Sequence, residues 1–144
     1  GKSLFVKLLE LYTQHGLFRE HLISITKKGR DGQEQIAAMM EKYRTTPPSQ
    51  LAGISVVGLY DYEKQEAKDL SNGQVCKIDL PKSNVLQFVL ADGSKVSARP
   101  SGTEPKIKFY FSVQGKLNVV NDFDNAYAAL GIKIDQITSD LGLN

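Results

Sequence analysis

The sequence is poor in the features that mark disulfide-rich, membrane-spanning and polyanion-binding proteins. Its 144 residues contain a single cysteine, Cys76, which excludes an intrachain disulfide and makes a reducing cytoplasm the simpler expectation. No apolar run approaches the roughly 20 residues that a membrane-spanning helix needs, so no membrane partner is expected. The net charge of +2 is too small to indicate polyanion binding by itself.

Groups that could bind a metal or act as nucleophiles are also sparse. The two histidines, His15 and His21, lie far along the sequence from any cysteine pair or carboxylate cluster, so we expect no metal site. Cys76 lacks neighbouring features that would mark a reactive thiolate. The apolar content of 41% is nevertheless normal for a globular domain, and the length suits one domain or one domain with part of another.

The most distinctive stretch is the loop at residues 99–105, which lies between two strand-like runs. Arg99 offers a planar guanidinium that can bind two oxygens of one anion at once. Ser101 and Thr103 add hydroxyl donors, and Gly102 lets the backbone approach a ligand without a Cβ. The two prolines restrict the residues before them, so less entropy is lost when a ligand binds. We call residues 99–106 the cradle and expect it to bind a phosphate or a carboxylate.

The local charge supports this expectation. Residues 94–108 hold four basic residues against one acidic residue, Glu104, a net charge of +3, which suits a small acidic ligand better than a long polyanion. Glu104 is expected to brace the loop beside Arg99, and Lys108 is expected to lie on a solvated strand face. On composition alone, an exposed Pro/Gly turn with no ligand explains the cradle about as well.

Hydrophobic periodicity predicts an α+β fold. The predicted strands and helices leave residues 63–74 as a polar, turn-rich connection, and Asp92-Gly93 suits a type I′ hairpin turn. Strands joined by hairpins, with helices to cover one face, indicate a mostly antiparallel sheet with helices on one side. The predicted helices cover 3–14, 32–44 and 122–141; the predicted strands cover 18–28, 54–62, 75–80, 85–90, 94–99 and 106–113.

Two segments resemble a known family. The run Arg99-Pro-Ser-Gly-Thr-Glu-Pro-Lys106, followed by an aromatic strand, resembles the phosphate-binding loop in the C-terminal domain of the α-D-phosphohexomutases, which include phosphoglucomutase and phosphomannomutase. Residues 19–29 resemble the start of that domain in the phosphoglucomutase/phosphopentomutase-like branch. The resemblance covers residues 17–144 as the C-terminal, substrate-phosphate-binding domain, while residues 1–16 resemble the closing helix of the preceding third domain.

The resemblance implies a fold and a role. That domain has a TATA-binding-protein-like α+β fold, and the full cytoplasmic enzyme is an isomerase, an intramolecular phosphotransferase of carbohydrate metabolism that acts through a bisphosphorylated sugar. Arg99, Ser101, Gly102 and Thr103 would contact the phosphate that is not reacting, and Lys106 would add charge. The implied partners are a hexose or pentose phosphate and the enzyme's own first three domains; the implied cofactor is Mg²⁺ in the full-length enzyme.

The sequence also departs from the family's complete pattern. It contains no Asp-x-Asp-x-Asp metal loop, no Gly-Glu-x-Ser sugar-reading loop and no serine in a Ser-His-Asn-Pro setting. We therefore expect a fragment without catalytic residues or Mg²⁺ ligands that is not competent alone, and its choice of sugar stays open. One alternative is a stand-alone phospho-ligand-binding regulatory module. The apolar face predicted over residues 3–14 argues against it, because that face needs a partner. A second alternative is a nucleic-acid-binding domain. It is supported only by the analogy with the TATA-binding-protein fold, and a shared fold does not imply a shared function.

Overall fold

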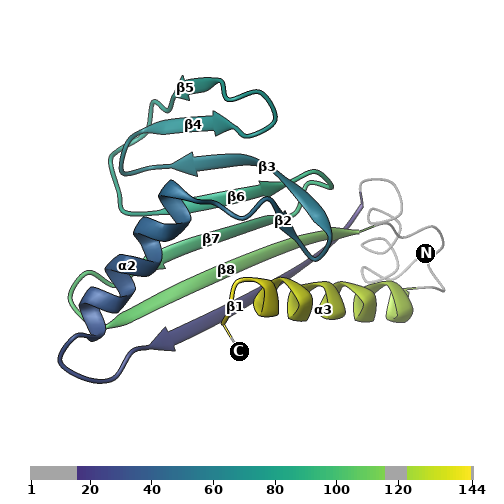
Figure 1. Cartoon of the computed structure of the whole chain (residues 1–144). Helices are drawn as coiled ribbons and strands as arrows, with labels where there is room; N and C mark the ends of the chain where they lie inside the picture. The colour runs from purple at the N-terminus through teal and green to yellow at the C-terminus, as the bar shows by residue number, and fades with distance from the viewer. Residues whose placement is uncertain (1–15, 116–122, 144) are drawn as a thin grey trace, which may run out of the picture.

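A single antiparallel sheet organises the protein (Figure 1). The computed structural model describes residues 16–115 and 123–143, so the helix predicted over 3–14 lies outside the described residues. The eight-stranded sheet has the order β1-β8-β7-β6-β3-β4-β5, and β2 pairs with β3 at the side. The strands are β1 (Leu17–Thr26), β2 (Gln50–Leu51), β3 (Ile54–Asp61), β4 (Glu66–Asp69), β5 (Val75–Lys77), β6 (Leu86–Leu90), β7 (Lys95–Pro100) and β8 (Lys106–Gly115).

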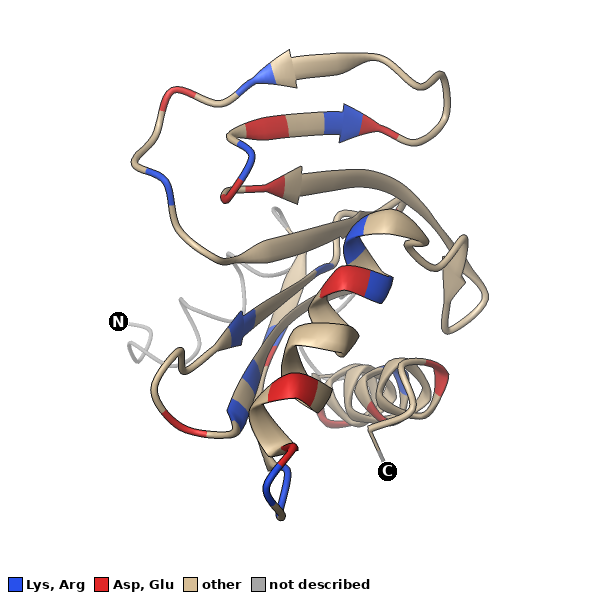
Figure 2. Cartoon of the chain, turned by 60° about the vertical axis from the view of Figure 1, so that its left-hand side comes forward, with Lys and Arg blue, Asp and Glu red and all other residues tan. Residues whose placement is uncertain are grey.

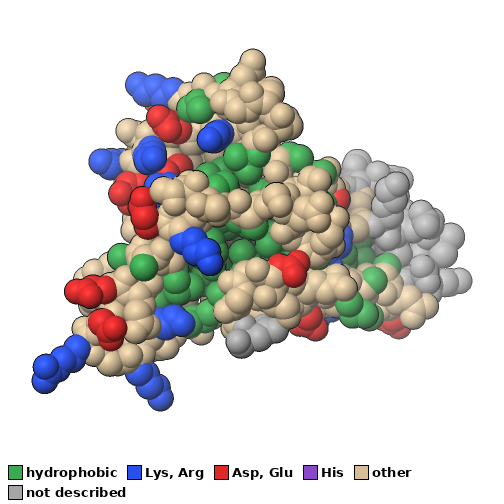
Figure 3. Space-filling model, in the orientation of Figure 1, with side chains coloured by type: hydrophobic (Ala, Val, Ile, Leu, Met, Phe, Trp, Pro, Cys, Tyr) green, Lys and Arg blue, Asp and Glu red, His purple; other side chains and the backbone are tan. Residues whose placement is uncertain are grey.

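Two helices cover one face of this sheet, as the sequence predicts (Figure 1). Helix α2 (Gly32–Thr45) packs on β6, β7 and β8, and helix α3 (Phe123–Asp140) packs on β1, β2 and β8. Hydrophobic side chains fill the space between the helices in Figure 3, with charged side chains at the end where α2 begins. The predicted α+β class is therefore confirmed. No helix in the described part of the chain is long and apolar enough to cross a membrane.

Strand β8 shows why one face of the sheet is buried and the other is exposed to solvent. Successive side chains of a strand point to opposite faces, so its alternating apolar and polar residues separate. The apolar set is at most 2% exposed and lies under the helices: Ile107, Phe109, Phe111 and Val113. The intervening residues, Lys108 and Tyr110 among them, point to the uncovered face, which we call the open face.

Helix α2 is fixed over the sheet by its apolar stripe and by one buried ion pair. Tyr43 packs edge-on against Phe88 and Phe109 at 5.8 and 6.2 Å, and burial raises the pKa of its hydroxyl. Near the end of the helix, the Arg44 Nε donates to Asp61 Oδ2 at 2.7 Å, with the two side chains 9% and 7% exposed. A buried guanidinium needs such a partner because an uncompensated charge inside a protein is costly.

Helix α3 covers the end of the sheet remote from the cradle. The Arg19 guanidinium lies 4.4 Å from the centre of the Tyr127 ring, and the Lys133 Nζ donates to Asp92 Oδ2 at 2.7 Å. Burial alone would raise the pKa of the Asp92 carboxyl, but hydrogen bonds from Lys133 and from the backbone and side chain of Ser94 outweigh burial and lower it. Lys133 thus ties α3 to the turn between β6 and β7.

Three local predictions are wrong. Strand β4 lies within the segment predicted as a polar connection. It was missed because its four residues carry no alternating apolar pattern and join the sheet through backbone pairing. Strand β5 ends at Lys77 and not at residue 80, and β7 extends through Pro100, which pairs with Ile107.

The hairpin turn between β6 and β7 also differs from the prediction. A type I′ turn requires a positive φ at both central residues, but of the pair only Gly93 has one, at +91°. The Leu90 N–H donates to the Ser94 carbonyl, which makes a three-residue loop. The Asp92 carboxylate accepts the Ser94 N–H at 2.9 Å, which holds Asp92 outside the left-handed region.

Candidate functional site

The cradle is built from the end of β7, a short turn and the start of β8. Arg99 and Pro100 belong to β7, where they pair with Lys108 and Ile107, so the irregular part is confined to residues 101–105. The Ser101 N–H donates to the Lys106 carbonyl at 2.9 Å and closes the turn. The guanidinium of Arg99 is therefore carried by a paired strand, not by the loop itself.

Two hydrogen bonds from other elements hold the turn in place. The Lys27 N–H, just after β1, donates to the Pro105 carbonyl at 2.8 Å. The Gln33 Nε2, in the first turn of α2, donates to the Thr103 carbonyl at 2.8 Å. Sequence reasoning missed Gln33, since nothing in a helical polar residue indicates a partner 70 positions away. A turn that is restrained in this way loses less entropy on ligand binding.

Gly102 has a backbone conformation in the turn that favours glycine. Its φ of +84° lies in the left-handed region, which glycine adopts without strain. A Cβ at this position would meet no protein atom within 4 Å, so packing within the protein does not require a glycine here. The turn geometry requires it.

A groove of about 650 Å³ lies beside the cradle on the open face. Its basic residues come from the two strands that the cradle joins, and Figure 2 shows basic positions gathered at those strand ends. Lys108, which we expected on a solvated face, lines the groove directly across from Arg99. The lining comprises Leu22, Ser24, Arg99, Pro100, Ser101, Glu104, Lys106, Lys108 and Tyr110.

The ion pairs leave Arg99 available to a ligand. The Glu104 carboxylate lies 3.2 Å from the Lys106 Nζ, so its ion-pair partner within the cradle is Lys106 and not Arg99. Both side chains of that pair are about half exposed, so water screens the interaction and it stabilises the fold little. Within residues 16–115 and 123–143, Arg99 makes no side-chain hydrogen bond or ion pair. The groove therefore contains an uncompensated guanidinium.

The predicted site residues do not all face the same space. Arg99, Ser101 and Lys106 line the open-face groove, whereas Gly102 lines a smaller cavity of about 190 Å³ between the turn and α2. The Thr103 hydroxyl lies 3.4 Å from the Ser101 hydroxyl, so these two donors can serve one ligand. The structure thus brings Arg99, Ser101 and Lys106 into one groove, with the Thr103 hydroxyl beside that of Ser101, while Gly102 lines the neighbouring cavity.

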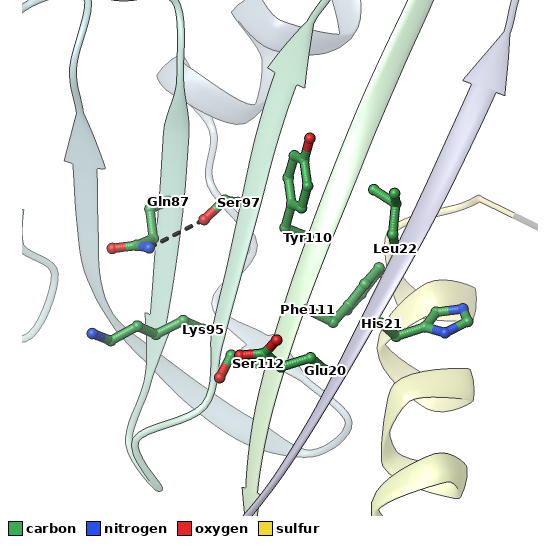
Figure 4. A pocket seen from close by; sticks show the side chains of 9 residues that line it. All are labelled: Glu20, His21, Leu22, Gln87, Lys95, Ser97, Tyr110, Phe111 and Ser112. Carbon is green, nitrogen blue, oxygen red and sulfur yellow. Dashed lines mark hydrogen bonds between the residues drawn. The ribbon is translucent and has the colours of Figure 1, made fainter.

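A second groove, of about 440 Å³, continues the first along the open face (Figure 4). Leu22 and Tyr110 line both grooves and project to the same side from β1 and β8. Polar side chains flank them, and the Gln87 Nε2 donates to the Ser97 hydroxyl at 3.1 Å. The open face therefore presents a cationic end, an apolar middle and a polar far end.

No group of three or more histidine, cysteine, aspartate or glutamate side chains within 16–115 and 123–143 could hold a metal ion. Cys76 is exposed on β5, at the opposite edge of the sheet from β1.

Comparisons with known proteins identify relatives of this chain. The chain is 39% identical over 121 residues to a phosphoglucomutase of Staphylococcus haemolyticus (strain JCSC1435), covering 84% of this chain and 21% of that protein. It is 40% identical over 114 residues to a phosphoglucomutase of Staphylococcus aureus (strain USA300), covering 79% and 20%. The chain belongs to the phosphohexomutase superfamily.

The match locates the chain within a phosphohexomutase as a C-terminal domain. The chain spans about a fifth of the length of the curated relatives it matches. The open form of pp63/parafusin, a phosphoglucomutase from Paramecium, shares the fold with a TM-score of 0.52 at 18% identity, over 98% of this chain and 23% of that one. No family model matches the chain.

Proposed function

We propose that this chain is the substrate-phosphate-binding domain of a phosphoglucomutase-type enzyme, where the cradle holds the phosphate that is not being transferred. The observation that carries the proposal is the unpaired guanidinium of Arg99 across from Lys108, with Lys106 and the Ser101 hydroxyl in the same groove. A phosphate monoester is a dianion with several acceptor oxygens, and it suits cations and hydroxyl donors that converge in this way.

The proposed division of labour leaves the transfer step to other parts of a longer enzyme. Residues 17–144 would form the binding domain, and residues 1–16 would belong to the domain before it. The enzyme's other domains would supply the phosphorylated serine, the Mg²⁺ ligands and the loop that reads the sugar. This chain binds and positions the substrate, and Glu104 serves to orient Lys106 and not as a general base.

The affinity of the isolated chain for phosphate should be low. Each charge-assisted hydrogen bond contributes about 1.5–3 kcal/mol, and only one end of the ligand is bound, so a dissociation constant in the millimolar range or so is expected. ³¹P NMR of inorganic phosphate, titrated with the protein, measures affinities in this range. Replacing Arg99→Ala should weaken binding by roughly 10- to 100-fold.

The matched control is Lys77→Ala, which removes the same charge from an exposed position on β5. It should change phosphate affinity less than about twofold, because charges farther apart than the Debye length are screened. Equal losses in the two variants would show binding by net charge alone and would overturn the proposal. So would unchanged binding in Arg99→Ala.

A further inference from the structure

Tyr110 is an exposed aromatic residue whose ring packs on no other described aromatic ring or cation. It is 43% exposed on the open face. The other tyrosines within 16–115 and 123–143 have ring partners: Tyr43 contacts Phe88 and Phe109, Tyr60 stacks on Tyr62, and Tyr127 contacts Phe123 and Arg19. Tyr110 makes no ring, hydrogen-bond or cation contact with any described residue. An aromatic face left bare in this way is available to a ligand.

Its position relates this ring to the cradle. Tyr110 lies two residues beyond Lys108 on β8 and points to the same face, which is a distance of about 7 Å along a strand. Leu22 on β1 and Ser97 on β7 are its direct cross-strand neighbours. Tyr110 and Leu22 also line both grooves, so a ligand that extends from the cradle along the open face must cross them.

The surroundings indicate the chemistry of that ligand's body. Beyond Tyr110 the second groove offers the Gln87 amide and the Ser97 and Ser112 hydroxyls, which can exchange hydrogen bonds with hydroxyl groups. A sugar ring has an apolar face of C–H groups for an aromatic ring and hydroxyls at its edge for such donors and acceptors. A purely apolar body would cover these groups and offer them no hydrogen bond beyond the one that Gln87 already makes to Ser97.

We propose that Tyr110 binds the sugar ring of the phosphate-bearing ligand, which lies along the open face while its phosphate is in the cradle. This inference rests on the proposed function, since it takes the phosphate position from it. Tyr110 is then a binding residue for the body of the substrate, and the helix-side cavity at Gly102 takes no part of the sugar.

The test compares two ligands, inorganic phosphate and glucose 1-phosphate, by NMR titration of the chain. The wild type should bind glucose 1-phosphate more tightly than inorganic phosphate by roughly three- to tenfold, as expected for one aromatic contact. Tyr110→Ala should bring this ratio to about one and change affinity for inorganic phosphate less than about twofold. Tyr110→Phe should keep the ratio, and saturation of aromatic protein protons should transfer to the sugar C–H protons only in variants that retain the ring.

The control variant is Tyr60→Ala, another exposed tyrosine on the same face that is stacked on Tyr62 and lines neither groove. It should leave the ratio unchanged. A ratio that persists in Tyr110→Ala, or one that falls equally in Tyr60→Ala, would overturn the inference. Failure of the proposed function looks different, because the wild type would then bind neither ligand or Arg99→Ala would bind both normally.

Discussion

Gly32, where α2 begins, is packed so closely against the cradle that it has no room for a side chain. A Cβ added there would overlap the Lys27 carbonyl oxygen and lie 2.9 Å from the Pro105 Cβ. Neither group is the end of a flexible side chain, so the backbone must move to accept a methyl group. Lys27 and Pro105 are also joined by the hydrogen bond that holds the exit of the cradle, so Gly32→Ala should disturb stability and binding together.

Two opposing effects set the size of the change in stability. Alanine favours a helix over glycine by at most about 1 kcal/mol, and by less in the first turn. Overpacking of a close contact costs about 1–3 kcal/mol. The clash should exceed the gain, so we expect Gly32→Ala to lower the free energy of unfolding by about 1–2 kcal/mol. If the displaced turn loses about 1 kcal/mol of preorganisation, phosphate affinity falls about fivefold.

Urea denaturation followed by far-UV circular dichroism measures the stability change, and ³¹P titration measures the affinity. The control is Gly58→Ala in β3, where an added Cβ would lie at an ordinary 3.5 Å from the Val89 Cβ. Its effect should be neutral or stabilising by about 0.5–1 kcal/mol, because alanine suits a strand better than glycine. A Gly32→Ala protein as stable as the wild type, with unchanged phosphate affinity, would refute this reasoning.

Two further substitutions test the packing around the site. Asp61→Asn leaves the buried Arg44 guanidinium without its carboxylate, so the free energy of unfolding measured by urea denaturation should fall by about 3 kcal/mol. The control Glu63→Gln, at a more exposed partner of Arg44, should lower it by less than about 1 kcal/mol. Equal losses in the two variants would contradict a buried pair. The pKa of Asp92 is lowered in the folded protein, so its contribution is present above the unfolded pKa and is lost as pH falls through the folded pKa. Asp92→Asn should therefore cost about 1 kcal/mol at neutral pH and nothing at low pH; a difference that grows on acidification would contradict this assignment.

Periodicity predicted the elements that bury a continuous face. The alternation of Ile107, Phe109 and Phe111 in β8 and the spacing of Ile36, Met40 and Tyr43 in α2 correspond to buried side chains. Such patterns are strong because exposing those residues to water would cost free energy at every second position, or at every third and fourth.

Elements without a buried face were not predicted, because they carry no hydrophobic periodicity. Strand β4, Glu66–Asp69, has no fully buried residue and joins the sheet only because β3 and β5 lie on either side of it. The turn at Asp92 depended on a choice between a two-residue and a three-residue hairpin loop, which differ in the sign of φ at Asp92. Such choices are made by tertiary neighbours and small energy differences, which one local pattern does not contain.

The candidate site was predictable in composition but not in arrangement. The cradle's Arg99, Ser101 and Lys106 follow from the loop sequence, yet their common groove depends on the register of β7 against β8. That register also places Lys108 in the groove, and alternation could have indicated it once the face of Arg99 was known. The anchor from Gln33 had no sequence signal.

The most direct test of the central claim is a map of backbone amide shifts as inorganic phosphate is added to the ¹⁵N-labelled chain. We expect the largest changes at residues 99–106 and at Lys108, with little change at Lys28 and Arg30 of the basic turn that follows β1. Largest shifts at that turn, or changes spread evenly over all basic positions, would contradict the claim that the cradle is a phosphate site.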